Sequence, residues 1–385
     1  MVLDILFSAE NIGTVQIKNR IVRSATFSRR AERYGRVGDQ MINFYQELAA
    51  GGTGLIITGF ISVDASGTIS PFQARLDDDS HISGQQNLVE AVHNISDVKI
   101  AAQIAHTGKQ GAHPKYPPIA PSSVKDNITG LIPREMSTEE TEQMIEKFVD
   151  AGYRAYVAGY DMVQLHAAHG YLLSNFISPY TNKRTDQFGG SIENMSRILV
   201  MIHDQLREKT GKHFPLIIKL QTQDFVKGGL TLDDGVKIAN IVIKTGFKAI
   251  EPSGGIAETQ IGTKDAYPSK IIKTQDDENY FLPVAKQLKP LMKENKLILV
   301  GGIKNPQSAE KILKNKYVDF ISMSRPLLYE PDLPNRWQSG DLTPAKCISC
   351  NQCYLSMLTA PTHCLVRKKL ERKKEKKLKE KFAKK

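Results

Sequence analysis

The sequence predicts a (β/α)8 barrel, the TIM-barrel fold, as a single domain with a short C-terminal extension. Eight short apolar segments alternate with segments of helical periodicity between residues 21 and 323, and such alternation is typical of parallel α/β folds. No Gly-x-Gly-x-x-Gly motif follows the first apolar segment, which argues against a doubly wound dinucleotide-binding sheet. The 385 residues exceed one ordinary domain but suit one barrel with insertions.

The expected strands are short, rich in β-branched residues and bounded by glycine or polar residues. In chain order they are Ile21–Thr26, Gly54–Gly59, Lys99–Ile104, Asp161–Leu165, Leu216–Gln221, Ala249–Pro252, Leu297–Val300 and Asp319–Met323. The expected helices between them are Asp39–Ala50, Gln85–Asn94, Ser137–Gly159, Ile192–Thr210, Leu232–Thr245, Phe281–Lys293 and Pro306–Asn315.

Local signals justify several helix ends. The helix that begins after Ser137 opens with a capping box, in which the serine caps the N-terminus and a glutamate three residues later reaches back to it. Glycines follow the expected helices at Gly51 and Gly246, as is common at helix C-termini. The connection between Ala105 and Met136 contains five prolines. A loop of that length is usually functional, and we expect it and residues 253–270 to shape a substrate pocket.

The composition is that of a soluble globular protein, with 41% hydrophobic and 24% charged residues. No apolar run approaches the roughly 18 residues that a membrane-spanning helix needs, and the N-terminus lacks the basic region of a signal peptide. We therefore expect a cytoplasmic protein without a membrane partner.

The net charge of +11 is concentrated at the C-terminus. Residues 367–385 contain twelve basic and three acidic residues, a charge of +9, which leaves +2 for the rest of the chain. Charge runs of this kind are usually a solvated, frayed helix or a disordered segment. The alternative is weak tethering to an acidic surface or to nucleic acid.

All four cysteines fall in one C-terminal segment, which we place at residues 341–366, between a barrel of residues 1–340 and the basic tail. Cytosolic proteins rarely form disulfides, so this grouping indicates a present or past metal or iron–sulfur site. The cysteines are Cys347, Cys350, Cys353 and Cys364.

Polar residues follow the expected strands at the end where barrel enzymes place their chemistry. His166, His169 and Tyr171 crowd the end of the fourth strand, where each can donate a hydrogen bond or a proton. Gly301-Gly302 and Ser324-Arg325 follow the seventh and eighth strands. Backbone N–H groups beside glycine and an arginine fork suit a phosphate group, so we expect a phosphate site there rather than simple turns.

These motifs carry a resemblance to a known family. Segments such as ELAAGGTGLIITG, AAQIAHTGKQ, HAAHGYLLSNFISPYTNKRTDQFGG, VGGI and DFISMSRPLL occur in order between residues 6 and 333. The chain resembles the old yellow enzyme family of FMN-dependent ene-reductases, in particular its NADH:flavin oxidoreductase branch and the barrel domain of 2,4-dienoyl-CoA reductase. The segment that begins at His166 is highly specific.

The resemblance implies a barrel of residues 1–340 that binds FMN on its strand ends. Lys219 would stabilise the negative charge of the reduced flavin, although many relatives have an arginine there, so the bidentate fork is lost. A charge within the apolar run LIIKL needs a partner in the barrel interior. The resemblance implies FMN contacts from Ser24, Ala25, Thr26, Gly59, Gln103, Lys219, Gly301, Gly302, Met323, Ser324 and Arg325.

The resemblance also implies a mechanism. His166 and His169 match the pair that binds the carbonyl oxygen of an α,β-unsaturated substrate, and Tyr171 matches the tyrosine that protonates its α-carbon. NADH or NADPH would pass a hydride to flavin N5, and the flavin would pass it to the C=C bond. The alternatives at these positions are a metal-binding histidine pair and a structural tyrosine.

Two other function classes remain open. One is an electron-transfer subunit in which the four cysteines hold a 4Fe-4S cluster, as relatives with similar cysteines do; the altered cysteine spacing leaves free thiols favoured. The other is an FMN-dependent RNA-modifying reductase, which needs a catalytic cysteine that residues before Cys347 do not supply. We therefore expect small-molecule partners and not nucleic acid. A homo-oligomer is compatible with the sequence.

Overall fold

The computed structural model describes residues 3–260 and 268–382. Eight parallel strands form a closed ring in the order β4-β3-β13-β12-β11-β10-β9-β6, and pairing between β4 and β6 closes it. The predicted (β/α)8 barrel is therefore confirmed. The strands are β3 Ile21–Arg23, β4 Leu55–Ile57, β6 Lys99–Ala105, β9 Met162–Ala167, β10 Leu216–Gln221, β11 Ala249–Ser253, β12 Lys296–Leu299 and β13 Phe320–Met323.

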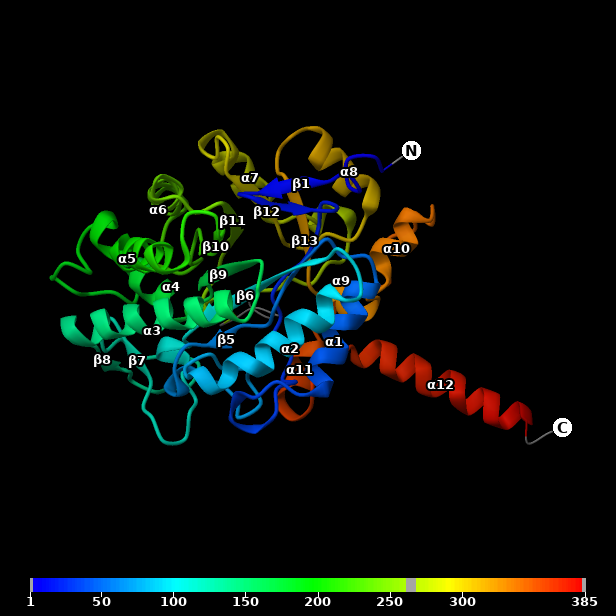
Figure 1. Cartoon of the computed structure of the whole chain (residues 1–385), viewed down its shortest axis with the longest axis horizontal. Helices are drawn as coiled ribbons and strands as arrows, with labels where there is room; N and C mark the ends of the chain where they lie inside the picture. The colour runs from blue at the N-terminus through cyan, green and yellow to red at the C-terminus, as the bar shows by residue number, and fades with distance from the viewer. Residues whose placement is uncertain (1–2, 261–267, 383–385) are drawn as a thin grey trace.

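Helices surround the ring and connect each strand to the next (Figure 1). Three of them, α1, α5 and α6, have the predicted boundaries, as does strand β10. The predicted helix Phe281–Lys293 is wrong at its C-terminal end, because Pro290 has no amide donor and converts the last turn to a 3-10 helix. The connecting helices are α1 Asp39–Ala50, α2 Ile82–His93, α3 Thr138–Val157, α5 Ile192–Thr210, α6 Leu232–Thr245, α7 Leu282–Leu288 and α8 Pro306–Lys314.

The capping box before α3 is present. The hydroxyl of Ser137 accepts a hydrogen bond from the Glu140 amide at 3.1 Å, and the Glu140 carboxylate accepts one from the Ser137 amide at 2.8 Å. The side chains of Ser191 and Thr231 cap α5 and α6 by accepting hydrogen bonds from the amides of Asn194 and Asp234. These caps explain why the sequence located the helix starts well.

The barrel interior is built in layers. An N-terminal hairpin, β1 Glu10–Ile12 and β2 Val15–Ile17, closes the end opposite the strand C-termini, where Ile12 and Ile17 pack against apolar side chains from every strand, two of them from β4. Side chains of a strand alternate in direction, so the residue two positions further along each strand also points inward. The apolar layer consists of Val22, Leu55, Ile57, Ala101, Met162, Ile217, Ala249, Ile298 and Phe320.

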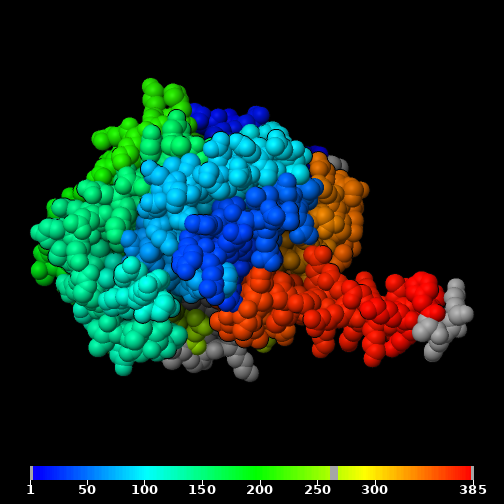
Figure 2. All heavy atoms as spheres, turned by 60° about the horizontal axis from the view of Figure 1, so that its bottom comes forward, coloured from blue at the N-terminus to red at the C-terminus, as the bar shows by residue number. Residues whose placement is uncertain are grey.

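Shorter elements decorate the open end of the barrel, and the C-terminal segment returns to it. The amide and hydroxyl of Thr362 donate to the carbonyls of Ser28 and Phe27 at 2.9 and 2.7 Å. Helix α12 then projects away from the barrel with its lysines exposed (Figures 1 and 2). These elements are β5 Ile61–Ser62, β7 Ile119–Ala120, β8 Arg134–Glu135, α4 Leu172–Ile177, α9 Arg325–Tyr329, α10 Leu333–Gln338, α11 Cys353–Thr359 and α12 Leu365–Phe382.

Two segments for which the sequence made predictions are described only in part. Part of the predicted pocket loop, residues 261–267, and the last three residues of the basic tail lie outside the described residues. None of the helices in residues 3–260 and 268–382 is long and apolar enough to cross a membrane.

Candidate active site

A polar layer lies directly above the apolar layer of the barrel. Its residues each follow an inward apolar residue by two positions on the same strand, as Lys219 follows Ile217 and Glu251 follows Ala249. All are buried, and hydrogen bonds connect them across the barrel. The polar layer consists of Ser24, Gln103, Gln164, Lys219, Glu251 and Ser322.

An ion pair forms the centre of the polar layer. Lys219 Nζ lies 2.9 Å from Glu251 Oε2 and donates to the Ser24 hydroxyl at 3.2 Å. The other carboxylate oxygen accepts from the hydroxyls of Ser24 and Ser322 at 2.8 and 2.9 Å. Burial alone would raise the pKa of Glu251, but the charge and hydrogen bond of Lys219, with smaller contributions from Ser24 and Gln164, lower the pKa overall. Glu251 is therefore ionised at neutral pH.

Two amide side chains extend the layer. Gln103 donates to Gln164 at 2.6 Å, and Gln164 donates to Glu251 at 3.1 Å. These bonds fix the orientation of the Gln103 amide, which was predicted to contact FMN. Glu251, Gln164 and Ser322 were not among the predicted site residues. The signal that would have revealed them is the period of two along each strand, counted from the apolar layer.

The ends of strands β3, β4 and β13 meet at the mouth of the barrel. The hydroxyls of Thr26 and Ser324 lie 2.7 Å apart, and the Ser24 amide donates to the Met323 carbonyl at 3.1 Å. A Cβ atom at Gly59 would lie only 2.4 Å from the carbonyl oxygen of Thr26, so a larger residue would push this edge apart. Ala25 is half-buried beside them.

His166, His169 and Tyr171 lie together at the mouth. The ring centroid of His166 lies 4.9 Å from that of His169 and 5.1 Å from that of Tyr171, in edge-to-face geometry. Phe60 packs against Tyr171 at 5.1 Å. His166 points inward from β9, four positions after Met162, while Tyr171 precedes the first turn of α4. The sequence prediction that these three groups share one site is therefore reproduced in the geometry.

Backbone strain positions His169. Its φ angle is +69°, a left-handed conformation that side-chain-bearing residues seldom adopt and that is often found at functional sites. The amide of His169 donates to the Gln221 side chain at 2.9 Å, and Nε2 lies 2.7 Å from the Ser253 hydroxyl. Gln221 and Ser253 end strands β10 and β11, so neighbouring strands hold the turn in place.

Burial sets the protonation states of these three groups. Desolvation, together with the charge of Lys219, lowers the pKa of His166 to about 3 and also lowers that of His169. Desolvation raises the pKa of the Tyr171 hydroxyl above its usual value. Both histidines are therefore neutral at pH 7, and Tyr171 keeps its proton.

The predicted phosphate region is divided in the structure. Gly301 and Gly302 have φ angles of +114° and +79°, conformations that favour glycine, and they pack against Tyr280. Arg325 instead donates through Nη1 to the carbonyls of Lys270 and Ser349 and to the Asn351 side chain, at 3.0, 3.2 and 2.6 Å. Arg325 thus ties the cysteine segment to the barrel, and its role as a phosphate ligand stays a prediction.

The four cysteines line one small cavity together with Arg325. Burial raises the pKa of Cys347 and raises that of Cys353 to about 11, so these thiols are protonated unless a ligand binds them. Within the described ranges, no group of three or more histidine, cysteine or acidic side chains can hold a single metal ion.

The mouth of the barrel fits FMN. The polar layer offers one cation and one amide at fixed positions, and Gly301 and Gly302 after β12 have backbone conformations that favour glycine. His166 Nδ1 is buried and has no hydrogen-bond partner among the described residues, as expected for a group that meets a ligand. Fold and site together define a flavin-binding barrel.

The chain belongs to the NADH:flavin oxidoreductase / NADH oxidase family, whose model matches residues 5–343. It is 36% identical over 351 residues to the NADH oxidase of Thermoanaerobacter brockii, covering 90% of this chain and 52% of that protein. It is 34% identical over 333 residues to the NADPH dehydrogenase of Halalkalibacterium halodurans, covering 86% of this chain and 92% of that protein.

A solved structure of 2-naphthoyl-CoA reductase in complex with 2-naphthoyl-CoA has a similar fold. The TM-score is 0.87 at 27% identity, and the match covers 95% of this chain and 57% of that chain. The chain therefore spans only about half the length of the NADH oxidase and of 2-naphthoyl-CoA reductase. The resemblance that the sequence motifs indicated is confirmed at the level of the family.

Proposed function

We propose that the protein is an NAD(P)H-dependent FMN oxidoreductase that reduces the C=C bond of an α,β-unsaturated carbonyl compound. The observation that carries this proposal is the meeting of His166, His169 and Tyr171 above the Lys219–Glu251 ion pair. The names of the relatives, NADH oxidase and NADPH dehydrogenase, support a reduced nicotinamide as the electron donor. The name of 2-naphthoyl-CoA reductase supports a conjugated carbonyl as the acceptor.

The binding of FMN requires a stable floor and fixed polar contacts. When bound, FMN accepts a hydride from the nicotinamide and later gives one to the substrate. Lys219 stabilises the negative charge that this reduction creates, and Gln103 orients the ring edge. Ser24, Ala25, Thr26 and the glycines at 59, 301 and 302 would contact the cofactor, together with Met323 and Ser324.

The histidines act on the substrate carbonyl. A neutral imidazole N–H donates a hydrogen bond to the carbonyl oxygen, which makes the β-carbon electrophilic and stabilises the enolate as charge develops. The lowered pKa of His166 keeps the ring neutral, so it polarises the carbonyl without giving up a proton. His169 is fixed in a second position by Gln221 and Ser253.

Tyr171 completes the reaction by protonating the α-carbon. A buried phenol whose pKa is raised stays protonated throughout the neutral range, so a proton is always available for the developing carbanion. Phe60 holds the Tyr171 ring at the mouth. The protonation state of the hydroxyl and the place of the ring at the mouth support this role.

Stopped-flow kinetics of Tyr171→Phe test the proposal. We expect oxidation of the reduced enzyme by 2-cyclohexenone to slow about 10² to 10⁴-fold, the usual contribution of a positioned general acid. Tyr160→Phe is the matched control, because Tyr160 is also buried but donates to Gln85 outside the barrel mouth. An unchanged oxidation rate in Tyr171→Phe removes the proton-donor role.

A second function is favoured by one observation, the convergence of four cysteines on one cavity beside Arg325. Four thiolates suit a 4Fe-4S cluster, which is larger than a single ion and accepts ligands spaced further apart. Such a cluster would supply one-electron transfer to the neighbouring flavin site. The protein would then act in electron transfer as well as, or in place of, enone reduction.

A further inference from the structure

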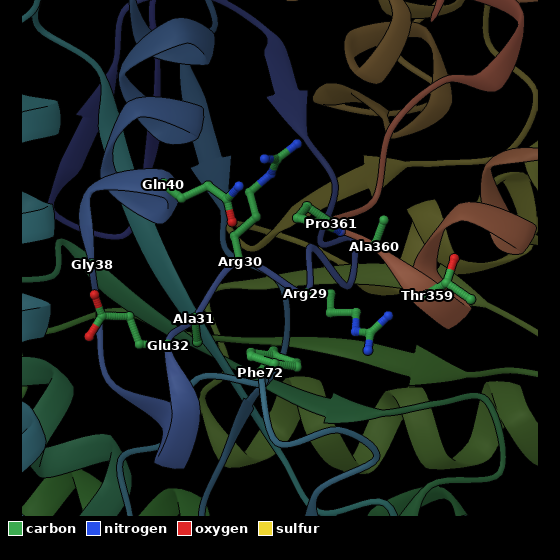
Figure 3. Close-up of a pocket in the computed structure, with 10 residues that line it drawn as sticks. All are labelled: Arg29, Arg30, Ala31, Glu32, Gly38, Gln40, Phe72, Thr359, Ala360 and Pro361. Atoms are coloured by element: carbon green, nitrogen blue, oxygen red, sulfur yellow. The ribbon is translucent and has the colours of Figure 1, made fainter.

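The segments around the mouth of the barrel are held in two different ways. The loop between β3 and α1 and residues 359–361 line a cavity of about 440 Å³ (Figure 3). In another part of the mouth, after β6 and β11, segments meet around three buried charged side chains, which we call the charged cluster: Lys109, Asp126 and Glu258. Charged side chains are rarely buried in full, and the proposed reaction uses none of these three.

One ammonium group faces two carboxylates in the charged cluster. Lys109 Nζ donates to Glu258 Oε1 and lies 3.8 Å from Asp126 Oδ2. Among the described residues, no other cation pairs with either carboxylate. Asp126 Oδ2 and Glu258 Oε2 are buried and accept no hydrogen bond there. Lys109 therefore compensates both negative charges, and its removal would leave two buried carboxylates without a cation.

The charged cluster joins the two loops that the sequence predicted to shape the substrate pocket. Lys109 lies near the start of the connection between Ala105 and Met136, in a 3-10 helix that follows β6, and Asp126 lies further along the same connection. Glu258 lies in a 3-10 helix after β11, within the other loop. The cluster thus folds the long connection back onto its own start and attaches it to the loop after β11.

Asp126 also fixes the turn in which it lies. Its Oδ1 accepts hydrogen bonds from the amides of Ile128 and Thr129 at 2.9 and 2.8 Å. The carboxylate therefore bonds to the turn through one oxygen and faces Lys109 through the other. If the cation is lost, this carboxylate should move toward solvent, and the two amides should lose their acceptor.

The 3-10 helix that carries Lys109 holds the turn between β9 and α4, where His169 lies. The Gln110 side chain donates to the His169 carbonyl at 2.7 Å. The Lys109 amide donates to Asn175 Oδ1 at 3.2 Å, and Asn175 Nδ2 donates to the Gly170 carbonyl at 2.9 Å. Two hydrogen-bond paths therefore lead from this 3-10 helix to the backbone just before the proposed proton donor.

The same turn is packed between the two segments that Lys109 joins. A Cβ atom at Gly170 would lie 2.8 Å from Gln110 Nε2 and 3.4 Å from Ile256 Cβ. Ile256 is buried and lies two residues before Glu258. A separation of the segments after β6 and β11 would therefore remove a support on each side of the turn and shift its side chains.

We propose that Lys109 is a positioning residue that locks both pocket loops against the turn of His169 and Tyr171, an inference that rests on the proposed function. Lys109 acts through the loops and not through contact with the substrate. Its charge keeps the two buried carboxylates in place, and the segments that carry the charged cluster hold the turn. A misplacement of reacting groups by about 1 Å costs about 10²-fold in rate, so this support is expected to matter for the reaction.

Stopped-flow oxidation of the reduced, FMN-loaded enzyme tests the proposal with two oxidants. Lys109→Met keeps the length of the side chain and removes its charge. We expect oxidation by 2-cyclohexenone to slow about 10²-fold. Oxidation by ferricyanide, which needs the flavin but not the turn, should stay at the wild-type rate. An unchanged enone reaction, or an equal slowing of both reactions, overturns the proposal.

A neutral form of the charged cluster tests whether charge compensation is the cause. The triple variant Lys109→Met/Asp126→Asn/Glu258→Gln buries amides in place of unpaired carboxylates, which costs less free energy. Its loops are no longer driven apart but lack the ion pairs, so we expect an enone reaction about 10-fold slower than wild type and faster than in Lys109→Met. This variant also decides the case in which Lys109→Met does not retain FMN. A triple variant as slow as Lys109→Met, or as fast as wild type, contradicts the proposed lock.

Hydrogen–deuterium exchange gives a readout that does not depend on activity. We expect the amides of residues 128–129 to exchange at least about 10-fold faster in Lys109→Met than in wild type. Arg30→Met is the control, because Arg30 lines the cavity in Figure 3 and joins two other segments through its hydrogen bond of 3.1 Å to the Thr362 carbonyl. We expect this control to match wild type at residues 128–129. Equal exchange in both variants overturns the lock.

The outcomes separate this inference from the proposed function. If the wild-type enzyme reduces 2-cyclohexenone but Lys109→Met shows neither slower reduction nor faster exchange, the function stands and the lock is refuted. If the wild-type enzyme does not reduce enones, the proposed function fails, whereas faster exchange in Lys109→Met still supports the lock between the loops.

Discussion

Replacement of Glu251 by glutamine tests the role of the buried ion pair. The substitution keeps the shape of the side chain and removes one negative charge at 2.9 Å from Lys219 Nζ. Lys219, which we propose contacts FMN, is then an uncompensated cation. Reduction of the flavin adds negative charge, so the reduced form is stabilised more than the oxidised form and the midpoint potential rises.

The geometry gives the size of the effect. The ion pair of 2.9 Å and one further hydrogen bond of about 3 Å from Lys219 to the flavin place the carboxylate roughly 6 Å from the developing charge. At an effective dielectric constant of about 20, two unit charges at this distance interact by about 3 kcal/mol. For a two-electron couple this energy corresponds to a rise of about 60 mV.

Spectroelectrochemical titration of the purified holoenzyme measures the midpoint potential directly. Glu330→Gln is the matched control, because Glu330 is also buried and paired with Lys346 and Arg336, but lies between α9 and α10 outside the polar layer. We expect the midpoint potential of this variant to stay within about 10 mV of wild type. A distant, screened charge changes the free energy of flavin reduction by at most about 0.5 kcal/mol. A folded, FMN-loaded Glu251→Gln protein with an unchanged potential refutes the electrostatic reasoning.

Three further predictions concern stability, cofactor retention and metal content. His106 is buried, and desolvation lowers its pKa from 6.5 to about 4. The unfolded chain therefore binds more protons than the folded protein between pH 6.5 and 4. The free energy of unfolding should fall by about 2 kcal/mol as the pH falls from 7 to 5. Urea unfolding should show a loss of stability that is smaller by this amount in His106→Gln than in the control His213→Gln, because the other buried histidines contribute equally to both. Gly59→Ala should release FMN on dialysis, because the new Cβ displaces the Thr26 carbonyl; full flavin occupancy contradicts this. If the cysteine cavity holds a cluster, anaerobically purified protein contains about four iron and four sulfide per chain, and absence of both excludes the cluster.

Most of the barrel could be predicted because its elements carry their own local signals. Helix α5 has a serine cap at Ser191 and a glycine at Gly211, and both boundaries were predicted correctly. The hairpin β1–β2 and helices α4 and α11 were missed. Each of these strands and helices has seven residues or fewer, so burial against the barrel, and not local propensity, stabilises them.

The candidate site was predicted unevenly for a physical reason. His166, His169 and Tyr171 are close in sequence, so a motif could reveal them. Glu251 pairs with Lys219 on the neighbouring strand β10 and contacts Ser24 across the barrel, and these residues are separated by many positions in the chain. Only the closed ring of strands brings such partners together, although the alternation of inward residues indicated which positions face the interior.

The layered interior of the barrel separates two properties, the electron affinity of the site and its range of substrates, that an enzyme engineer would wish to change independently. The ion pair that we propose sets the electron affinity lies in one layer, and the groups that we propose meet the substrate lie in the next, on strands that both layers share. Directed evolution confined to the mouth and its loops should therefore broaden the range of accepted compounds at a constant driving force. Selection for a stronger or weaker reductant should instead concentrate its mutations in the polar layer below the mouth.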